Sequence, residues 1–184
     1  MATNLRPFRD YDEHDVVNLF AFSGSYPQNK GAIVTIMGAG WKNTDEPFDM
    51  AGGAGAAYGN TVSQRYGLNS YVRQCASGET PLGMTIHDVR ETDENGEKLI
   101  YNPRKAVEMG CVISGQAVPV LTRGTVLYSG TTLAGLTVNA GDSLYATAAG
   151  ELTNAHDSTW THVKVGKALG AKDTNNHVLV RLEL

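Results

Sequence analysis

The residues of this chain that could hold a metal ion are most concentrated between positions 91 and 102. Oxygen-bearing side chains recur at every second position in Glu91, Asp93 and Asn95, and Gly96 follows them, which imitates the first half of a calcium-binding loop. Position twelve of such a loop requires a bidentate Glu, whereas this chain has Asn102 there. Because Asn95-Gly96 is also the strongest short signal for a β-hairpin, the sequence predicts a turn here and no metal site.

The other candidates for catalysis or ligand binding lack the spacing that their chemistry requires. None of the five histidines belongs to a His-Glu-x-x-His pair, and no serine lies in a Gly-x-Ser-x-Gly nucleophile elbow. The glycines at 53, 55 and 59 miss the spacing of a dinucleotide-binding loop, and the run 12–15 is typical of a solvated charged segment. We therefore expect no catalytic residue, no cofactor and no metal ion, and we predict that the chain is not an enzyme. The enzyme alternative, a small hydrolase without a recognisable motif, would be tested at His87 and Asp88.

The composition is that of a globular protein with a weak acidic balance. The 184 residues are 41% hydrophobic and 18% charged, and the net charge is −4. The longest basic run is Arg104-Lys105, so the chain lacks the footprint of a nucleic-acid-binding protein. No apolar run approaches the roughly 18 residues of a membrane-spanning helix, and the N-terminus lacks the apolar core of a signal peptide. We therefore expect a protein that is made in a cytoplasm and binds neither nucleic acid nor membrane.

The cysteine content does not indicate a disulfide framework, because the chain has only Cys75 and Cys111. A reducing cytosol favours two separate thiols. A bridge between the two remains open at this point.

The elements that must position these residues are mostly short β-strands. The 21 glycines divide the chain at short intervals, as in an all-β protein with many tight turns. A helix is predicted only over 103–109, with Asn102 as its cap and Pro103 at its first position. Strands are predicted over 16–22 (with a short helix capped by Asp12 as the alternative), 32–37, 71–76, 84–90, 97–101, 111–113, 117–122, 125–128, 143–147, 163–165 and 178–184.

The predicted fold class is all-β: an antiparallel sandwich or a small barrel, with an extended N-terminal arm and a long Gly-rich loop. Residues 1–15 are the predicted arm, and 16–184 are a single β domain whose best-patterned part is 111–184. Residues 38–60 contain six glycines among Ala, Asp and Asn and are predicted to form a long excursion loop. Long ordered loops in compact domains tend to be functional, so we expect this loop to contact a neighbour.

Two stretches of the chain resemble structural proteins of phage virions. In the C-terminal half, Ser114–Val120, Arg123–Val126, Ala140–Tyr145 and Val163–Leu169 are similar to the small β-barrel decoration proteins of tailed-phage capsids, in which a Gly-Asp-x-Leu-Tyr strand precedes a Val-x-Val-Gly-x-Ala strand. Leu5–Tyr11 with Val16–Phe20 resembles the start of structural virion proteins of podophages and cyanophages. The Gly-rich stretch 38–60 departs from the minimal family pattern.

The resemblance implies a cement protein that binds the outside of a phage capsid and stabilises the shell by clamping neighbouring capsomers. Its expected partner is the phage major capsid protein, its expected location is the virion surface, and a homo-oligomer, preferably a trimer, is implied. We expect contact residues in the arm and in the excursion loop, where large aromatics and cations provide interface anchors: Arg6, Phe8, Arg9 and Tyr11 in the arm, and Trp41, Phe48 and Tyr58 in the loop. Packing of Trp41 and Phe48 onto their own domain is the alternative for these two side chains.

A second function remains open at this stage. The chain would then be a phage fibre or tail component, or a receptor- or glycan-binding β domain. Such a domain would use exposed aromatic side chains on one sheet face, with Trp160 and Tyr128 as candidates.

Overall fold

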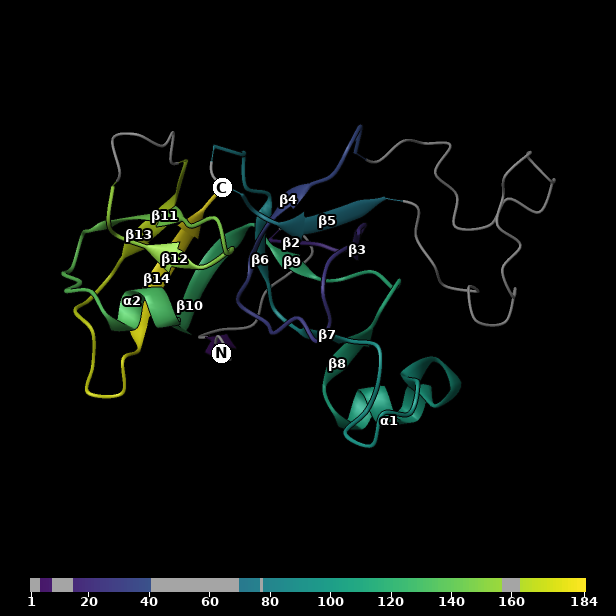
Figure 1. Ribbon diagram of the computed structural model, residues 1–184. Helices are drawn as coiled ribbons and strands as arrows, with labels where there is room; N and C mark the ends of the chain where they lie inside the picture. Colours follow the sequence, from purple (N-terminus) through teal and green to yellow (C-terminus); the bar gives the residue numbers. More distant parts are fainter. Residues whose placement is uncertain (1–3, 8–14, 41–69, 77, 157–162) are drawn as a thin grey trace.

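The computed structural model describes residues 4–7, 15–40, 70–76, 78–156 and 163–184, and within them the fold is mostly β, as predicted (Figure 1). Sheet A, on the left of Figure 1, is antiparallel throughout and has the order β1-β10-β14-β13-β11-β12. These strands are β1 (Asn4–Pro7), β10 (Arg123–Ser129), β14 (Val178–Glu183), β13 (Lys164–Ala168), β11 (Ser143–Ala146) and β12 (Leu152–Thr153).

Sheet B, in the middle of Figure 1, closes on itself into a small barrel. Its order is β2-β9-β6-β4-β5-β3, and β2 and β3 belong to one run of chain. Ala21 pairs with Tyr71 on one side and forms a bridge with Ala117 on the other, just before β9, so the last strand in the order returns to the first. The strands are β2 (Val16–Val17), β9 (Val120–Leu121), β6 (Gly83–Thr85), β4 (Ile33–Ile36), β5 (Tyr71–Gln74) and β3 (Ala21–Phe22).

Neighbouring residues of the barrel strands point to opposite faces and belong to two different hydrophobic cores. In β4, Val34 belongs to the core of the barrel, whereas its neighbour Ile33 packs with sheet A. In β9, Val120 and Leu121 divide in the same way. Successive strand residues point to opposite faces, so one wall of the barrel also serves as the second layer against sheet A. The sheet-A side of this shared core is contributed by Val126, Tyr128, Leu144, Ala146, Leu152, Val165, Ala168, Val178, Val180 and Leu182.

Thr122 lies where the chain passes from the barrel to sheet A. It is the one residue between β9 and β10, so these two strands form a nearly continuous stretch. Its amide and its hydroxyl both donate to the carbonyl of Asp15, at 2.8 Å and 3.0 Å. Its own carbonyl accepts from the amide of Leu184 at 3.2 Å. The start of the barrel and the end of sheet A are therefore held at one residue.

Residues 88–116 form a lobe that projects at the lower right of Figure 1. The strands β7 (Asp88–Arg90) and β8 (Cys111–Ile113) pair in parallel, and between them lie the 3-10 helix η1 (Leu99–Tyr101) and the helix α1 (Pro103–Glu108). A parallel pair needs such a crossover connection. The lobe has its own small core of Leu99, Ala106 and Ile113, and it joins the barrel through paired hydrogen bonds between Gln28 and Val89.

The same hairpin loop occurs at residues 93–97 and 173–177. In each, the amide of the first residue donates to the carbonyl of the fifth, and the Asp carboxylate accepts from the amides two and four residues later. The fourth residue has a positive φ, 84° at Gly96 and 62° at Asn176, as in three-residue hairpin loops. The predicted turn at Asn95-Gly96 is thus confirmed, although only Gly96 takes the left-handed conformation.

Several predicted elements differ in extent from the observed ones. The run 16–22 forms two short strands with different partners, and 84–90 divides between β6 in the barrel and β7 in the lobe. Residues 99–101 were predicted as strand but form η1, because the return pairing stops at the bridge between Thr92 and Lys98. The predicted helix at 103 is confirmed with Pro103 at its start, but the side chain of Asn102 makes no capping hydrogen bond.

Within the predicted arm, Asn4–Pro7 form β1, which lies at the edge of sheet A. Within the predicted excursion loop, the structure describes only 38–40. The sequence analysis missed two further elements of sheet A and its surroundings, β12 and the one-turn helix α2 (Thr131–Ala134).

The helix α2 is held at both ends by charged side chains from distant parts of the chain. At its N-terminus the carboxylate of Glu151 accepts hydrogen bonds from the hydroxyls of Thr131 and Thr132 and from the amide of Thr132 at 2.9 Å. At its C-terminus the ammonium of Lys172 donates to the carbonyls of Ala134 and Leu136, at 2.6 Å and 2.9 Å. Both charges match the helix dipole, and they satisfy backbone groups that a helix end leaves unpaired.

Gly166 in β13 gives the first prediction, because a β-carbon there would lie 2.1 Å from the carbonyl oxygen of Arg181 on β14. We expect Gly166→Ala to lower the free energy of unfolding by about 2–3 kcal/mol, since a rigid backbone atom must move. Gly170→Ala is the matched control, because that site has open space, and it should change stability by less than about 0.5 kcal/mol. Denaturant unfolding measures both values, and equal stabilities would contradict the close approach of β13 and β14.

Glu151 gives a prediction about acid stability. Burial raises the pKa of this carboxyl, but the hydrogen bonds from Thr132 and Thr131 outweigh burial and leave the pKa below its ordinary 4.5. The folded state therefore gains stability from the carboxylate at pH above 4.5 and loses it as the pH falls below that value. We expect Glu151→Gln to cost about 1 kcal/mol at pH 7, the usual cost of a lost helix cap, and to flatten the stability profile below pH 4.5. Glu108→Gln, in an exposed ion pair with Arg104, is the control and should change little; a parallel acid profile for both variants would disprove the role of Glu151.

Candidate functional site

The contact residues predicted from the sequence fall mostly outside the part of the chain that the structure describes. The backbone of Arg6 lies in β1, opposite Leu127 of β10. The remaining predicted contact residues lie outside the described residues: Phe8, Arg9, Tyr11, Trp41, Phe48 and Tyr58. The structure therefore does not test these contact residues, and they stay predictions.

A first group of exposed apolar side chains lies at the end of the barrel where the chain leaves for residue 41 and returns at residue 69. Ile36 and Tyr71 are 41% and 39% exposed, and the amide of Met37 donates to the carbonyl of Tyr71 at 2.9 Å. Leu19, 52% exposed, precedes the strand β3 that pairs with β5. We call Leu19, Ile36 and Tyr71 the barrel-end group.

A second group lies on the lobe. Tyr101 at the end of η1 is 73% exposed, and Val107 of α1 is 79% exposed, the highest values among the large apolar residues that the structure describes. Ala106, the neighbour of Val107, is buried in the lobe's core. Two adjacent apolar residues in so short a helix cannot both face inward, and this adjacency was the sequence signal for the exposure of Val107.

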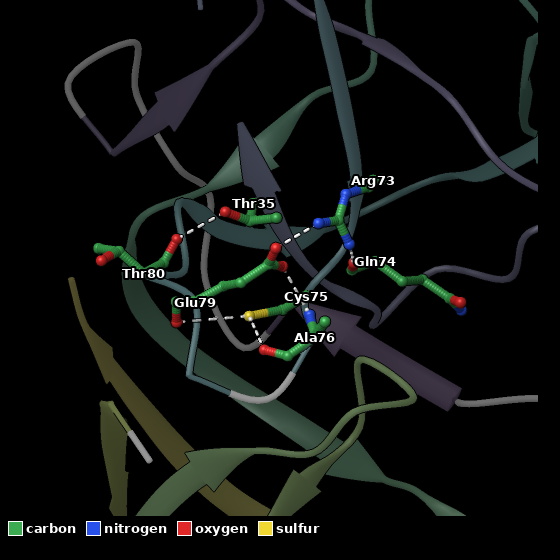
Figure 2. A network of polar contacts seen from close by, with 7 residues as sticks. All are labelled: Thr35, Arg73, Gln74, Cys75, Ala76, Glu79 and Thr80. Carbon is green, nitrogen blue, oxygen red and sulfur yellow. Dashed lines mark hydrogen bonds and ion pairs between the residues drawn. The ribbon is translucent and has the colours of Figure 1, made fainter. Parts of the chain in front are cut away.

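The loop between β5 and β6 is fixed by polar contacts next to the barrel-end group, and Figure 2 shows them. The carboxylate of Glu79 forms an ion pair with Arg73 and accepts from the amide of Ala76 at 2.8 Å. The hydroxyl of Thr35 donates to the carbonyl of Thr80 at 2.8 Å. These side chains hold the loop in place, so their charges are used by the fold.

The residues that could do chemistry are used in the same way. Asp88 accepts from the amide of Lys30 at 2.9 Å and pairs with Arg90 at 3.5 Å, while a ring nitrogen of His87 lies 3.3 Å from the carbonyl of Gly110. In the calcium-like run, one carboxylate oxygen of Asp93 accepts two backbone amides of its own turn. Among the described residues, no group of three or more His, Cys, Asp or Glu side chains is placed to hold a metal ion. Nor does any described helix have the length and apolar character to cross a membrane.

Tyr128 corrects the expectation of an aromatic platform for a glycan. Its ring is fully buried in the shared core, and its hydroxyl accepts from the amide of Leu152 at 3.1 Å. Burial raises the pKa of this phenol, which stays neutral. Tyr128 therefore faces inward because the alternation of β10 places it beside Val126, and Trp160, the other candidate, lies outside the described residues.

Both cysteines are free thiols, as the sequence analysis favoured. Cys75 is 1% exposed and lies in the shared core, where its thiol donates to the carbonyl of Ala76 at 3.4 Å. Cys111 is partly exposed and lies on β8 in the lobe.

Comparison with known proteins gives one family. The model of a family described as "Structural cement protein (E217 gp24/Pam3 gp6)" matches residues 22–184 of this chain. The match includes the barrel from β3 onward, the lobe and all of sheet A except β1. A search of curated proteins found no match.

The two thiols give a prediction, because they should differ in reactivity: Cys75 lies in the shared core and Cys111 in the lobe. Burial raises the pKa of Cys75 to about 11, and burial also raises the pKa of Cys111. We expect a thiol reagent at pH 8 to modify one cysteine per chain in the native protein and two after unfolding, because only the thiolate of an accessible cysteine reacts. Cys111→Ser should abolish the native reaction. Modification of two thiols at equal rates in the native protein would contradict the burial of Cys75.

Proposed function

The chain belongs to the phage structural cement protein family, and from this membership we propose that it binds the outside of a phage capsid and clamps neighbouring capsomers. The match over residues 22–184 is the observation that carries the proposal. Membership makes the chain a structural phage protein with its place in the virion capsid. The capsid surface that it touches, the clamping and the stabilisation of the shell are our proposal.

Two separated groups of exposed apolar side chains support the clamping. A protein that joins two neighbours needs contact area on two sides of its body, and it needs no pocket. The barrel-end group and the lobe's Tyr101 and Val107 lie on different parts of the molecule, since β4 ends and β5 begins in the upper part of Figure 1 and the lobe is at the bottom. Large apolar and aromatic side chains are frequent anchors of protein interfaces.

The contact residues expected from the sequence remain part of the proposal. Trp41, Phe48 and Tyr58 lie inside the stretch that the family model matches, whereas Arg6, Phe8, Arg9 and Tyr11 precede it. We therefore assign the first set to the contact shared with the family, and the second set to a contact particular to this chain.

The proposed partner is the phage major capsid protein, and the proposed form is a homo-oligomer, with a trimer favoured. Nucleic acid and membrane are not proposed as partners, in keeping with a net charge of −4 and no long basic run. A protein that binds the mature shell more tightly than its precursor shifts the equilibrium toward the mature shell by mass action. Binding at 100 times the dissociation constant contributes about 2.7 kcal/mol per site.

The experiment that tests the function is co-sedimentation of the purified chain with mature capsids that lack it, with a sizing run of the free protein alongside. We expect saturable binding at a fixed ratio to the major capsid protein, and bound shells should resist heat better than bare shells. The sizing run reports whether the protein docks as a preformed oligomer. No binding at any protein concentration would refute the proposal.

The exposed side chains of the lobe give a prediction that the same assay tests. We expect Tyr101→Ser with Val107→Ser to weaken shell binding by about tenfold or more, equivalent to roughly 1.4 kcal/mol. Both side chains are largely exposed, so the variant should fold normally. Leu169→Ser is the control, since Leu169 is a 40% exposed residue next to β13, outside both groups. Equal affinities of the lobe variant and the control would remove the lobe from the contact surface.

A further inference from the structure

The outer edge of β10 accepts a strand by main-chain pairing. On one side β10 pairs with β14 from Arg123 to Tyr128, and on the other it pairs with β1 only from Val126 to Ser129. We call the outer backbone edge of Val126–Ser129 the acceptor edge. Without β1, an edge of this kind is a template for another strand, because main-chain hydrogen bonds depend little on side-chain identity.

The chain that connects β1 to the barrel is longer than its own pairing requires. Pro7 lies opposite Val126, and the carbonyl of Asp15 is hydrogen-bonded to Thr122. Thr122 and Val126 are four residues apart on one extended stretch, which is about 13 Å. The eight steps from residue 7 to residue 15 can span about 26 Å. Covalent geometry therefore does not oblige β1 to use the acceptor edge of its own chain.

The acceptor edge and the strand that fills it also differ in their relation to the family match. Val126–Ser129 lie within the stretch that the family model matches, and Asn4–Pro7 lie before it. The edge thus belongs to the shared body, whereas the strand belongs to a segment outside the match. Exchange of identical strands between copies preserves every backbone pair, so its cost in free energy is small.

We propose that β1 is an exchangeable strand: where copies of this chain lie side by side, β1 of one copy pairs with β10 of the next, in the antiparallel register of Asn4 with Ser129 and Pro7 with Val126. The inference rests on the proposed function, because a capsid surface holds many copies next to one another. The exchange of β1 would link neighbouring copies on the capsid without further contact area on the barrel or the lobe. The occupant of the edge is a second copy of this chain.

The test uses two variants of the full-length chain, each with one introduced cysteine: Arg6→Cys and Leu127→Cys, at positions that are cross-strand partners in the register. Both carry Cys111→Ser, and Cys75 stays because it is buried. The two variants are mixed and oxidised, once bound to shells and once as concentrated free protein. Pairing within a chain cannot link them, because each chain has only one of the two partners. We expect a disulfide-linked species of twice the chain mass in at least one of the two samples.

The double variant Arg6→Cys/Leu127→Cys reports the pairing itself. A disulfide within single chains of the double variant, with no linked species from the mixed variants in either sample, overturns the proposal. A lack of any disulfide in the double variant also overturns it, because the register would then be wrong. Co-sedimentation of the same samples separates this outcome from a failure of the proposed function: shells that bind the variants without linking them refute the exchange alone.

Discussion

The apolar core between the barrel and sheet A is the constraint on which the other parts of the structure depend. It combines side chains of both layers, with Ile33, Met84 and Leu121 from the barrel and Tyr128 and Leu144 from sheet A among its fully buried members. Because one barrel wall must face this core and also line the barrel's interior, its strands are apolar on both faces. A shared core of this kind makes the two layers one body.

Close backbone packing and long-range capping complete that body. Gly166 lets β13 approach β14 to a distance at which any side chain would meet the carbonyl of Arg181. The short helix α2 lacks the length to be stable alone and depends on Glu151 and Lys172, which come from different connections of sheet A. The charges of Glu151 and Lys172 therefore stabilise the fold.

The surface that remains has a different character. Within the described residues, five of the seven exposed large apolar side chains are at the barrel end or on the lobe, and the other two are Leu169 and Leu184. The lobe is a separate β-helix-β unit with a small core of its own, and it is tied to the barrel by the pairing of Gln28 with Val89. Apolar groups at separate places on one body suit a structural protein, because protein–protein contacts need buried area and no pocket.

The sequence by itself determined the elements whose signals are local. The strand predicted over 178–184 is observed as β14, in which Val178, Val180 and Leu182 are buried. Asn95-Gly96 located a turn because only a few residues tolerate positive φ, and Pro103 located the start of α1. The resemblance of the C-terminal half to phage decoration proteins led to the family that the family model also gives.

Only the tertiary structure decided which strands are neighbours and which side chains reach the surface. Alternation says that a strand has two faces, but it does not say what covers them, so Tyr128 was expected outside and lies in the core. The barrel closes through Ala21 and Ala117, and α2 is capped through Glu151, contacts that join residues far apart in the chain. Such contacts depend on the packing of the whole chain, and no local sequence pattern predicts them. The exposure of Tyr101 has the same cause, since the lobe's core contains Leu99 and has Ile100 packed against it, while Tyr101 lies outside.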